Sequence, residues 1–185
     1  LRRSDIDRDE KIVTVDHQLI YKNIGDGRGC VFRICPPTTK AGIRKVPLTG
    51  AVLKALTEIK KQQFLLGIDH TIDIDGYKNF IITSSTGKPL APNAVNNILY
   101  GIVESHNRTE VIKAKGENRK PFLLPHISCH ILRHTGCTRM AESGMDPKVL
   151  QYIMGHADIS ITMNIYNHIT EFRRIQSEME RIEDV

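Results

Sequence analysis

Residues 126–168 constrain the fold most, because helix start and stop signals follow one another closely along this stretch. Ser128 favours a helix start, and Gly144 is typical of a helix C-terminus. The Asp-Pro pair at 146–147 favours the beginning of a second helix, since proline is tolerated in a first helical turn. Gly155 then predicts a tight turn before a third helix. The stretch therefore predicts three helices joined by two short turns.

Four residues with useful chemistry lie on these three helices. His130 and Arg133 are three positions apart, so they share one helix face. His156 follows the glycine turn, and Tyr166 comes ten residues later. A phenol is a poor nucleophile at neutral pH, since its ordinary pKa lies near 10. A phosphodiester suits such a group, because a guanidinium can grip its oxygens while imidazoles donate hydrogen bonds or move protons.

The segments HILRHT and MGHADISITMNIYNH resemble the C-terminal catalytic motif of the tyrosine recombinases, the family of phage and transposon integrases. Each motif alone is weak, whereas their order and the helix caps between them form a strong signal. The spacing from His156 to Tyr166 is one residue longer than in some relatives and suits the integrases of mobile elements. The resemblance implies an α+β fold: a mainly helical catalytic domain with a small antiparallel three-stranded sheet.

The resemblance also implies a role for each of these residues. Tyr166 would attack the scissile phosphate and form a 3′-phosphotyrosine bond, and Arg133 would stabilise the transition state. His130 would accept the tyrosine proton or contact a phosphate oxygen, and His156 would donate a hydrogen bond. Each has a simpler interpretation, as a core histidine, a salt-bridge partner or a packed aromatic. We interpret the neighbouring His134 and His168 as structural.

The segment TTKAGIRKVPL, residues 38–48, predicts a tight turn followed by a strand. Lys40 at the edge of this turn resembles the family's hairpin lysine, which serves as general acid toward the leaving 5′ hydroxyl. Lys45 is the fallback for that role and a candidate DNA contact. Arg44 is expected to meet a DNA phosphate.

The rest of the chain predicts alternating short elements. Glycines at 25–29 favour a hairpin turn over a phosphate-binding loop, since no Lys-Ser or Lys-Thr follows them. Strands at 12–15, 30–35 and 43–48 would supply the three-stranded sheet. An amphipathic helix is expected at 49–68 and a further helix at 91–108. Between and after them we expect a polar loop at 69–79, a short buried strand at the start of 80–90, and a mobile connector at 109–126. An apolar stripe after Tyr166 predicts a terminal helix.

The family's first catalytic arginine is expected upstream of Leu1, because a similar Leu-x-x-x-Asp-Ile-Asp segment follows that arginine's helix in the family. We therefore interpret residues 1–185 as one catalytic domain that lacks its N-terminal start, with DNA-binding domains upstream. On this interpretation the fragment alone would be inactive.

The formal net charge of +5 and a pI near 9.1 favour a polyanionic partner, here double-stranded DNA. By resemblance, further partners are protomers of a tetrameric synapse, reached through the terminal helix, and an excision factor. No cofactor, ATP or metal is expected. Four scattered cysteines fit a reducing compartment, and no membrane span or signal peptide is visible. We expect a cytoplasmic, nucleoid-associated protein encoded by a bacterium or phage.

Three rival functions share parts of this pattern. A type IB topoisomerase fragment would use the same chemistry to relax DNA instead of exchanging strands. A catalytically inactive DNA-binding module would lack the first arginine, and a metal-dependent nuclease would be sensitive to EDTA. The DNA target, the directionality and the source element cannot be inferred from the sequence.

Overall fold

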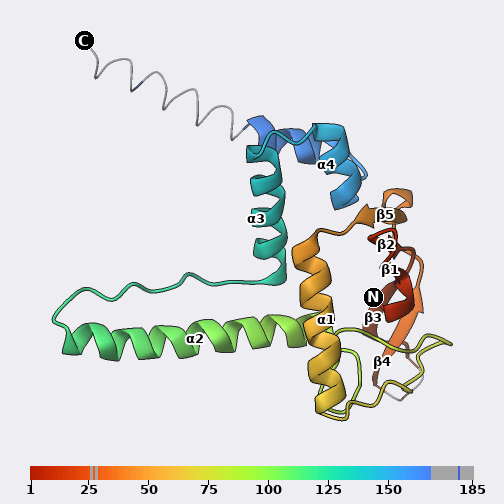
Figure 1. The fold of residues 1–185 in the computed structure, drawn as a ribbon, viewed down its shortest axis with the longest axis horizontal. Helices are drawn as coiled ribbons and strands as arrows, with labels where there is room; N and C mark the ends of the chain where they lie inside the picture. The colour runs from red at the N-terminus through yellow and green to blue at the C-terminus, as the bar shows by residue number, and fades with distance from the viewer. Residues whose placement is uncertain (26, 28, 168–178, 180–185) are drawn as a thin grey trace.

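The computed structural model describes residues 1–25, 27, 29–167 and 179, and these residues form a mainly helical α+β structure (Figure 1). A three-stranded antiparallel sheet has the order β1 (Ile6–Asp7), β2 (Ile12–Val15) and β5 (Arg44–Pro47). In its register Val13 lies opposite Val46. The predicted fold class and its small sheet are confirmed.

The strand predicted at 30–35 exists as β4 (Cys30–Cys35), but its place in the three-stranded sheet was wrong. It pairs with β3 (Gln18–Asn23) in a separate two-stranded sheet, from Gln18 opposite Cys35 to Asn23 opposite Cys30. The hairpin turn predicted between them is confirmed, with Gly25, Gly27 and Gly29 at positive φ. Strands joined by so short a glycine-rich turn close at a low entropic cost, so they pair with each other first.

Helix α1 (Gly50–Leu65) begins where the sequence predicts, with the Thr49 hydroxyl accepting a hydrogen bond from the Val52 amide at 3.4 Å. Its inner face carries half-buried Leu53, Leu56 and Ile59 and the buried Gln63. The apolar Phe64 of the same helix is 83% exposed among the described residues. It lies one position past Gln63 and so points away from the packed face.

The strand expected near residue 80 is not a strand of either sheet. The backbone of 69–90 is irregular, with isolated bridges such as Arg2 opposite Phe80. Phe80 and Ile81 are nevertheless buried, as predicted. The Ile81 amide donates to the Leu1 carbonyl at 3.1 Å, so this segment completes its hydrogen bonds against the N-terminal segment instead of a long ladder.

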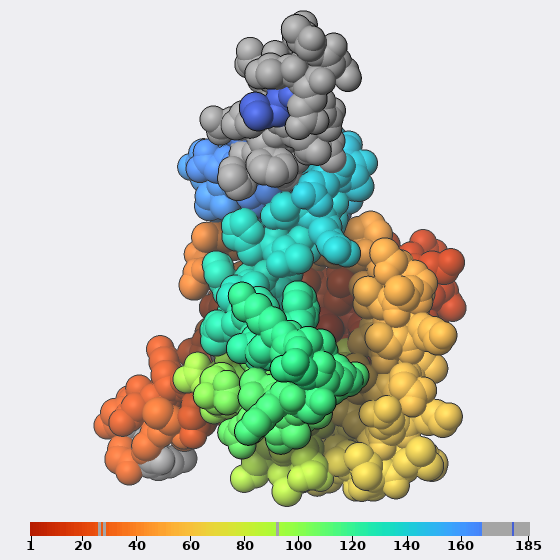
Figure 2. Space-filling view, turned by 90° about the vertical axis from the view of Figure 1, so that its left-hand side faces the viewer, coloured from red at the N-terminus to blue at the C-terminus, as the bar shows by residue number. Residues whose placement is uncertain are grey.

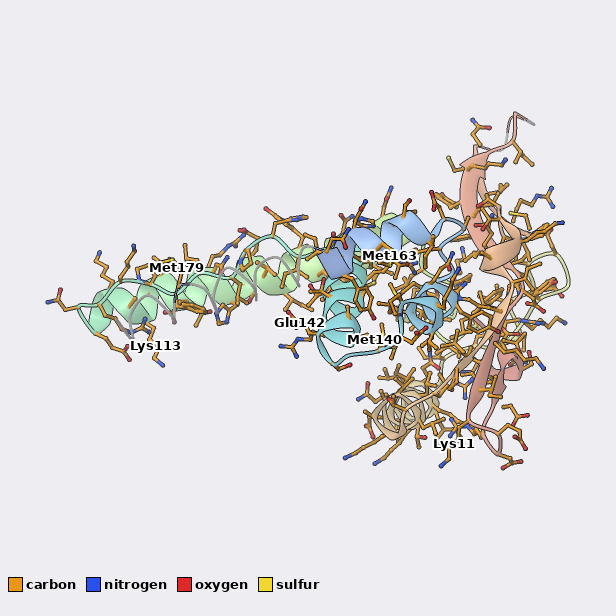
Figure 3. The ribbon with its side chains drawn as sticks, turned by 90° about the horizontal axis from the view of Figure 1, so that it is seen from above. Lys11, Lys113, Met140, Glu142, Met163 and Met179 are labelled. Atoms are coloured by element: carbon orange, nitrogen blue, oxygen red, sulfur yellow. The ribbon has the colours of Figure 1, made fainter. Side chains whose placement is uncertain are left out.

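Helix α2 (Pro92–Gly116) is longer than predicted, so the part of the expected connector from 109 to 116 is helical. Glutamate, lysine and alanine in this part are good helix formers, which explains the extension. Residues 117–128 then run back along α2 to the base of α3 (Figure 1). Seen from above, Lys113 near the end of α2 lies on one side of the molecule and Lys11 beside the sheet lies on the other (Figure 3).

The three helices predicted from 126–168 are present as α3 (Cys129–Glu142), α4 (Pro147–Met154) and a helical stretch at 159–167. Ser128 caps α3 by accepting from the Ile131 amide at 3.3 Å, and Asp146 caps α4. Gly155 ends α4 in the left-handed region with φ 68°, as the predicted tight turn requires. The predicted terminal helix lies outside the described residues.

One buried cluster holds this end of the chain together. Cys137 and Ala141 of α3 pack against Leu150 and Met154 of α4, and Tyr166 packs at the edge. Helix α4 lies between α3 and β5, so it joins the helical end to the sheet (Figure 1). Below it the space-filling view shows a hollow between α1 and the α2–α3 side (Figure 2). Among the described helices, none combines the length and apolarity needed to cross a bilayer.

Candidate active site

Helix α3 presents His130 and Arg133 on one face, as their spacing predicts. The Arg133 guanidinium donates a hydrogen bond to the carbonyl of Met154, the last residue of α4. Carbonyls at a helix C-terminus lack partners within the helix and carry partial negative charge, so they attract a cation. This contact places Arg133 beside the turn that leads to His156.

His156 is held by the helices on either side of the turn. Its Nδ1 lies 3.0 Å from the hydroxyl of Thr162, which is fully buried. Its amide donates to the Gln151 carbonyl at 3.1 Å, and the Gln151 side-chain amide donates to the His156 carbonyl at 3.2 Å. Because Nδ1 is engaged by Thr162, Nε2 is the imidazole nitrogen left for a ligand.

A pocket of about 370 Å³ opens between these helices. Three predicted catalytic residues, His130, Arg133 and His156, line it together. Its remaining lining residues are His134, Cys137, Thr138, Met154, Ile161, Asn164 and Ile165. His134, which the sequence favours as structural, is therefore also at the pocket wall.

The pocket is electropositive. Burial and the nearby Arg133 and Arg44 guanidiniums lower the pKa of His156, so its imidazole favours the neutral form. Burial and then Arg133 also lower the pKa of Arg44. None of the described lining residues is acidic. Two guanidiniums near each other without a carboxylate in the described pocket wall suit an anion such as a phosphate.

The turn that carries Lys40 adjoins this pocket without lining it. Lys40 begins a short 3-10 turn, Lys40–Gly42, and its side chain is exposed. Arg44 joins the turn to the pocket, because its Nη1 donates to the Gly42 carbonyl and its Nε to the Ile153 carbonyl, both at 2.9 Å. Lys45 is exposed, and its amide donates to the Tyr152 hydroxyl at 3.1 Å.

Tyr166 is half-buried one residue past the pocket-lining Ile165, and it is not itself a lining residue. Its hydroxyl donates to the Met145 carbonyl at the α3–α4 turn. Burial, then the Asp146 carboxylate and Cys137, raise its pKa. In this position the phenol is held neutral, so it is a weak nucleophile.

The phage integrase family matches residues 1–173 of the chain. The chain belongs to this family. The match covers the sheet, α1 to α4 and the helical stretch with Tyr166, so the resemblance drawn from the motifs is confirmed.

Relatives place the chain near the transposon members of the phage integrase family. It is 36% identical over 179 residues to a transposase from transposon Tn916 of Enterococcus faecalis, covering 96% of this chain and 39% of that protein. It is 28% identical to a "Tyrosine recombinase XerC-like" protein of Caldanaerobacter subterraneus, covering 91% of this chain and 40% of that protein. The chain thus spans well under half the length of these curated relatives.

Solved structures agree with this placement. A Tn1549 transposon integrase in complex with transposon right end DNA superposes with a TM-score of 0.74 at 34% identity, covering 99% of this chain and 52% of that one. The same integrase in complex with circular intermediate DNA also has a TM-score of 0.74, covering 98% of this chain and 53% of that one. The XerA recombinase, at 21% identity and a TM-score of 0.53, shares the fold.

Sequence reasoning missed Thr162 and Gln151, which hold the pocket in shape, and it gave Arg44 only the role of a DNA phosphate contact. Thr162 and Gln151 both bond His156, and Arg44 bonds two carbonyls. Only Thr162 gives a signal in the sequence, because it is a polar residue between the apolar Ile161 and Met163. It is fully buried, and a buried hydroxyl needs a hydrogen-bond partner. His168 lies outside the described residues.

Proposed function

We propose that this chain is the catalytic part of a tyrosine site-specific recombinase that integrates or excises a mobile element. The observation that carries the proposal is the pocket in which Arg133, His130 and His156 meet without an acidic residue in its described wall, beside the helix of Tyr166. Membership of the phage integrase family and the likeness to a DNA-bound transposon integrase support it.

The proposed reaction is a phosphoryl transfer through a covalent intermediate. The Tyr166 oxygen bonds to the scissile phosphorus while the bond from phosphorus to the 5′ oxygen breaks. The phenolic proton passes to His130, and Lys40 supplies a proton to the departing 5′ oxygen. Arg133 and the His156 Nε2 stabilise the phosphorane-like charge. Rejoining reverses these steps when a 5′ hydroxyl attacks the phosphotyrosine, so the bond energy is conserved.

In this proposal Tyr166 must change its hydrogen-bond partner before cleavage. Its hydroxyl now donates a hydrogen bond to the Met145 carbonyl. A carbonyl oxygen can only accept a hydrogen bond, so it cannot stabilise a phenolate. Binding of a phosphate between Arg133 and the two histidines would draw the attacking oxygen toward the pocket. The adjoining Ile161 and Ile165 already line the pocket from the same helix.

Double-stranded DNA is the proposed partner, with Lys45 as a phosphate contact because it is exposed beside the Lys40 turn. The phosphate contact predicted for Arg44 stays a prediction. In this structure its Nε and Nη1 donate to backbone carbonyls. The proposal also includes a tetrameric synapse, an excision factor and a nucleoid-associated bacterial location.

The test is covalent trapping on a nicked DNA substrate of the element's own attachment site, with EDTA present and the protein in the form that its source encodes. We expect an adduct that mass spectrometry maps to Tyr166 and that Tyr166→Phe loses. Tyr100→Phe, which changes an exposed tyrosine on α2, is the matched control and should form the adduct normally. An adduct that survives Tyr166→Phe would reject this nucleophile.

The trapping experiment, together with assays of plasmid relaxation and strand exchange, separates the rival functions. No adduct on the element's own site, together with retained DNA binding, would favour the inactive DNA-binding module. Relaxation of a supercoiled plasmid without an attachment site would favour the topoisomerase, whereas strand exchange that requires two attachment sites supports the recombinase. Loss of cleavage in EDTA would indicate a metal-dependent nuclease.

A further inference from the structure

The side chain of Arg44, on strand β5, makes hydrogen bonds to two separate segments of the backbone. Its Nε donates to the Ile153 carbonyl, one residue before the end of α4, and its Nη1 donates to the Gly42 carbonyl in the Lys40 turn. The side chain therefore bridges two segments that are more than a hundred residues apart in the sequence. Its donors belong to one rigid, planar group, so the two carbonyls are held at a set separation.

Gly155 shows how closely the guanidinium fits this corner. A Cβ on Gly155 would lie 2.6 Å from the Arg44 Nη1, 2.8 Å from its Cζ and 3.1 Å from the Ala41 carbonyl oxygen. Both the Arg44 side chain and the Lys40 turn thus pack directly on the residue that precedes His156. The αL conformation of Gly155 already favours glycine, and this contact leaves no room for a side chain.

We propose that Arg44 is a positioning residue that clamps the Lys40 turn to the Gly155–His156 turn. The clamp sets the distance between the proposed general acid and the proposed phosphate donor, two groups that lie on separate parts of the fold. Arg44 acts through the two turns without touching the reacting atoms. The proposal rests on the function proposed above for Lys40 and His156.

The side-chain chemistry explains why arginine suits this position. A lysine ammonium is a single point donor on a flexible stem, so it would reach one carbonyl well and the other poorly. Methionine has a similar reach without donors or charge. Arg44→Lys therefore keeps the charge and weakens the clamp, whereas Arg44→Met removes both.

The first test compares cleavage of bound DNA with DNA affinity in these variants. We expect Arg44→Met to slow adduct formation at saturating DNA by about a hundredfold, since small misplacements of catalytic groups have effects of this order. Its DNA affinity should change much less, and Arg44→Lys should recover part of the rate. Lys54→Met, which removes an exposed lysine of α1, is the control and should change neither the rate nor the DNA affinity.

The second test does not depend on activity. It measures the pKa of His156 by NMR titration. The His156 imidazole is faced by Arg133 from α3, by Arg44 from β5 and by Thr162 from the next helix. Arg44→Met should raise its pKa, because one nearby cation is removed, and Arg44→Lys should not. Amide exchange at Gly155 and His156 should quicken in Arg44→Met and Arg44→Ala and stay at the parental rate in Lys54→Met.

The outcomes separate the two proposals. A parental protein that forms no Tyr166 adduct would overturn the recombinase, while the amide exchange would still decide whether the clamp exists. A parental adduct with normal single-turnover cleavage in Arg44→Met would overturn the positioning role alone. Equal losses of rate in Arg44→Met and Lys54→Met, or unchanged exchange at Gly155 and His156, would also overturn it.

A double-mutant cycle checks the contact itself. Gly155→Ala should lower the melting temperature strongly in the parental protein and by less in the Arg44→Ala background, because the guanidinium that its Cβ meets is gone. Part of the loss should remain, since the positive φ and the Ala41 carbonyl are unchanged. Additive losses would show that Arg44 does not press on this turn.

Discussion

The α3–α4 end of the molecule and helix α2 respond differently to the same kind of sequence signal. Both are clearly helical in sequence. At the α3–α4 end the starts of α3 and α4 both carry a side-chain cap, and the two helices share one buried cluster in which Leu150 is fully buried, although Leu132 and Val149 are exposed. The N-cap residue of α2, Ala91, provides no side-chain hydrogen bond, and the helix exposes 61% of Ile102 and 74% of Ile112.

The contrast separates helix formation from helix burial. Propensity and caps act within a turn or two, so they produce α2 as readily as α3. Burial requires apolar partners from elsewhere in the fold. Within the described residues, few apolar side chains pack against the outer half of α2. The α3–α4 end therefore carries the organised pocket, while α2 supplies a long surface.

The largest contrast should be in catalysis. Arg133→Ala removes the guanidinium from the pocket and should slow covalent adduct formation by roughly 100- to 1,000-fold, the usual cost of one transition-state donor. DNA binding should weaken only modestly. Arg108→Ala, which removes an exposed arginine of α2 paired with Glu104, is the matched control and should cleave normally in the same single-turnover assay. A large loss of binding with normal cleavage of bound DNA would contradict the role of Arg133.

The next contrast is in stability. Leu150→Ala empties a fully buried site in the cluster and should lower the free energy of unfolding by about 2–5 kcal/mol. Ile112→Ala on α2 should change it by less than about 0.5 kcal/mol, because that side chain is already exposed. Urea unfolding measures both. Similar losses at the two positions would mean that α2 is covered in solution.

Helix caps should show a smaller effect of opposite sign in the two regions. Asp146→Ala removes the acceptor of the Lys148 and Val149 amides and should cost about 1 kcal/mol. Asp146→Asn should restore most of it. Ala91→Asp should instead stabilise α2, by about 0.5 kcal/mol or more, because that N-terminus lacks a side-chain cap. Thermal unfolding that responds to neither change would show that these ends are held by packing.

The smallest predicted effect is on pH dependence. The pKa of His156 is lowered in the folded protein, so between that value and the ordinary value of about 6.5 the unfolded chain binds more protons. Stability should therefore be full above that window and fall as the pH falls through it. His156→Gln should flatten this slope in urea midpoints measured from pH 8 to pH 5. Part of the slope should remain, because burial and Arg3 also lower the pKa of His70. An unchanged slope would refute the contribution of His156.

Local sequence signals predicted the helical end well. Ser128, Asp146 and Gly155 act on their own turns, and each does so in the structure. The prediction failed where a choice between distant partners decided the outcome. The strand at 30–35 pairs with 18–23 instead of joining the sheet of β2 and β5. Residues 109–116 extend α2, because their charged side chains favour helix as much as loop.

The candidate site divides in the same way. The order of His130, Arg133, His156 and Tyr166 is a property of the sequence. It predicted the family, and its first three members line one pocket, whereas Tyr166 does not line it. Only the tertiary structure decided that the Tyr166 hydroxyl meets the Met145 carbonyl and that Arg44 joins two distant turns. Caps and periodicity depend on neighbours a few residues away, whereas the direction of a side chain depends on which distant backbone packs against it.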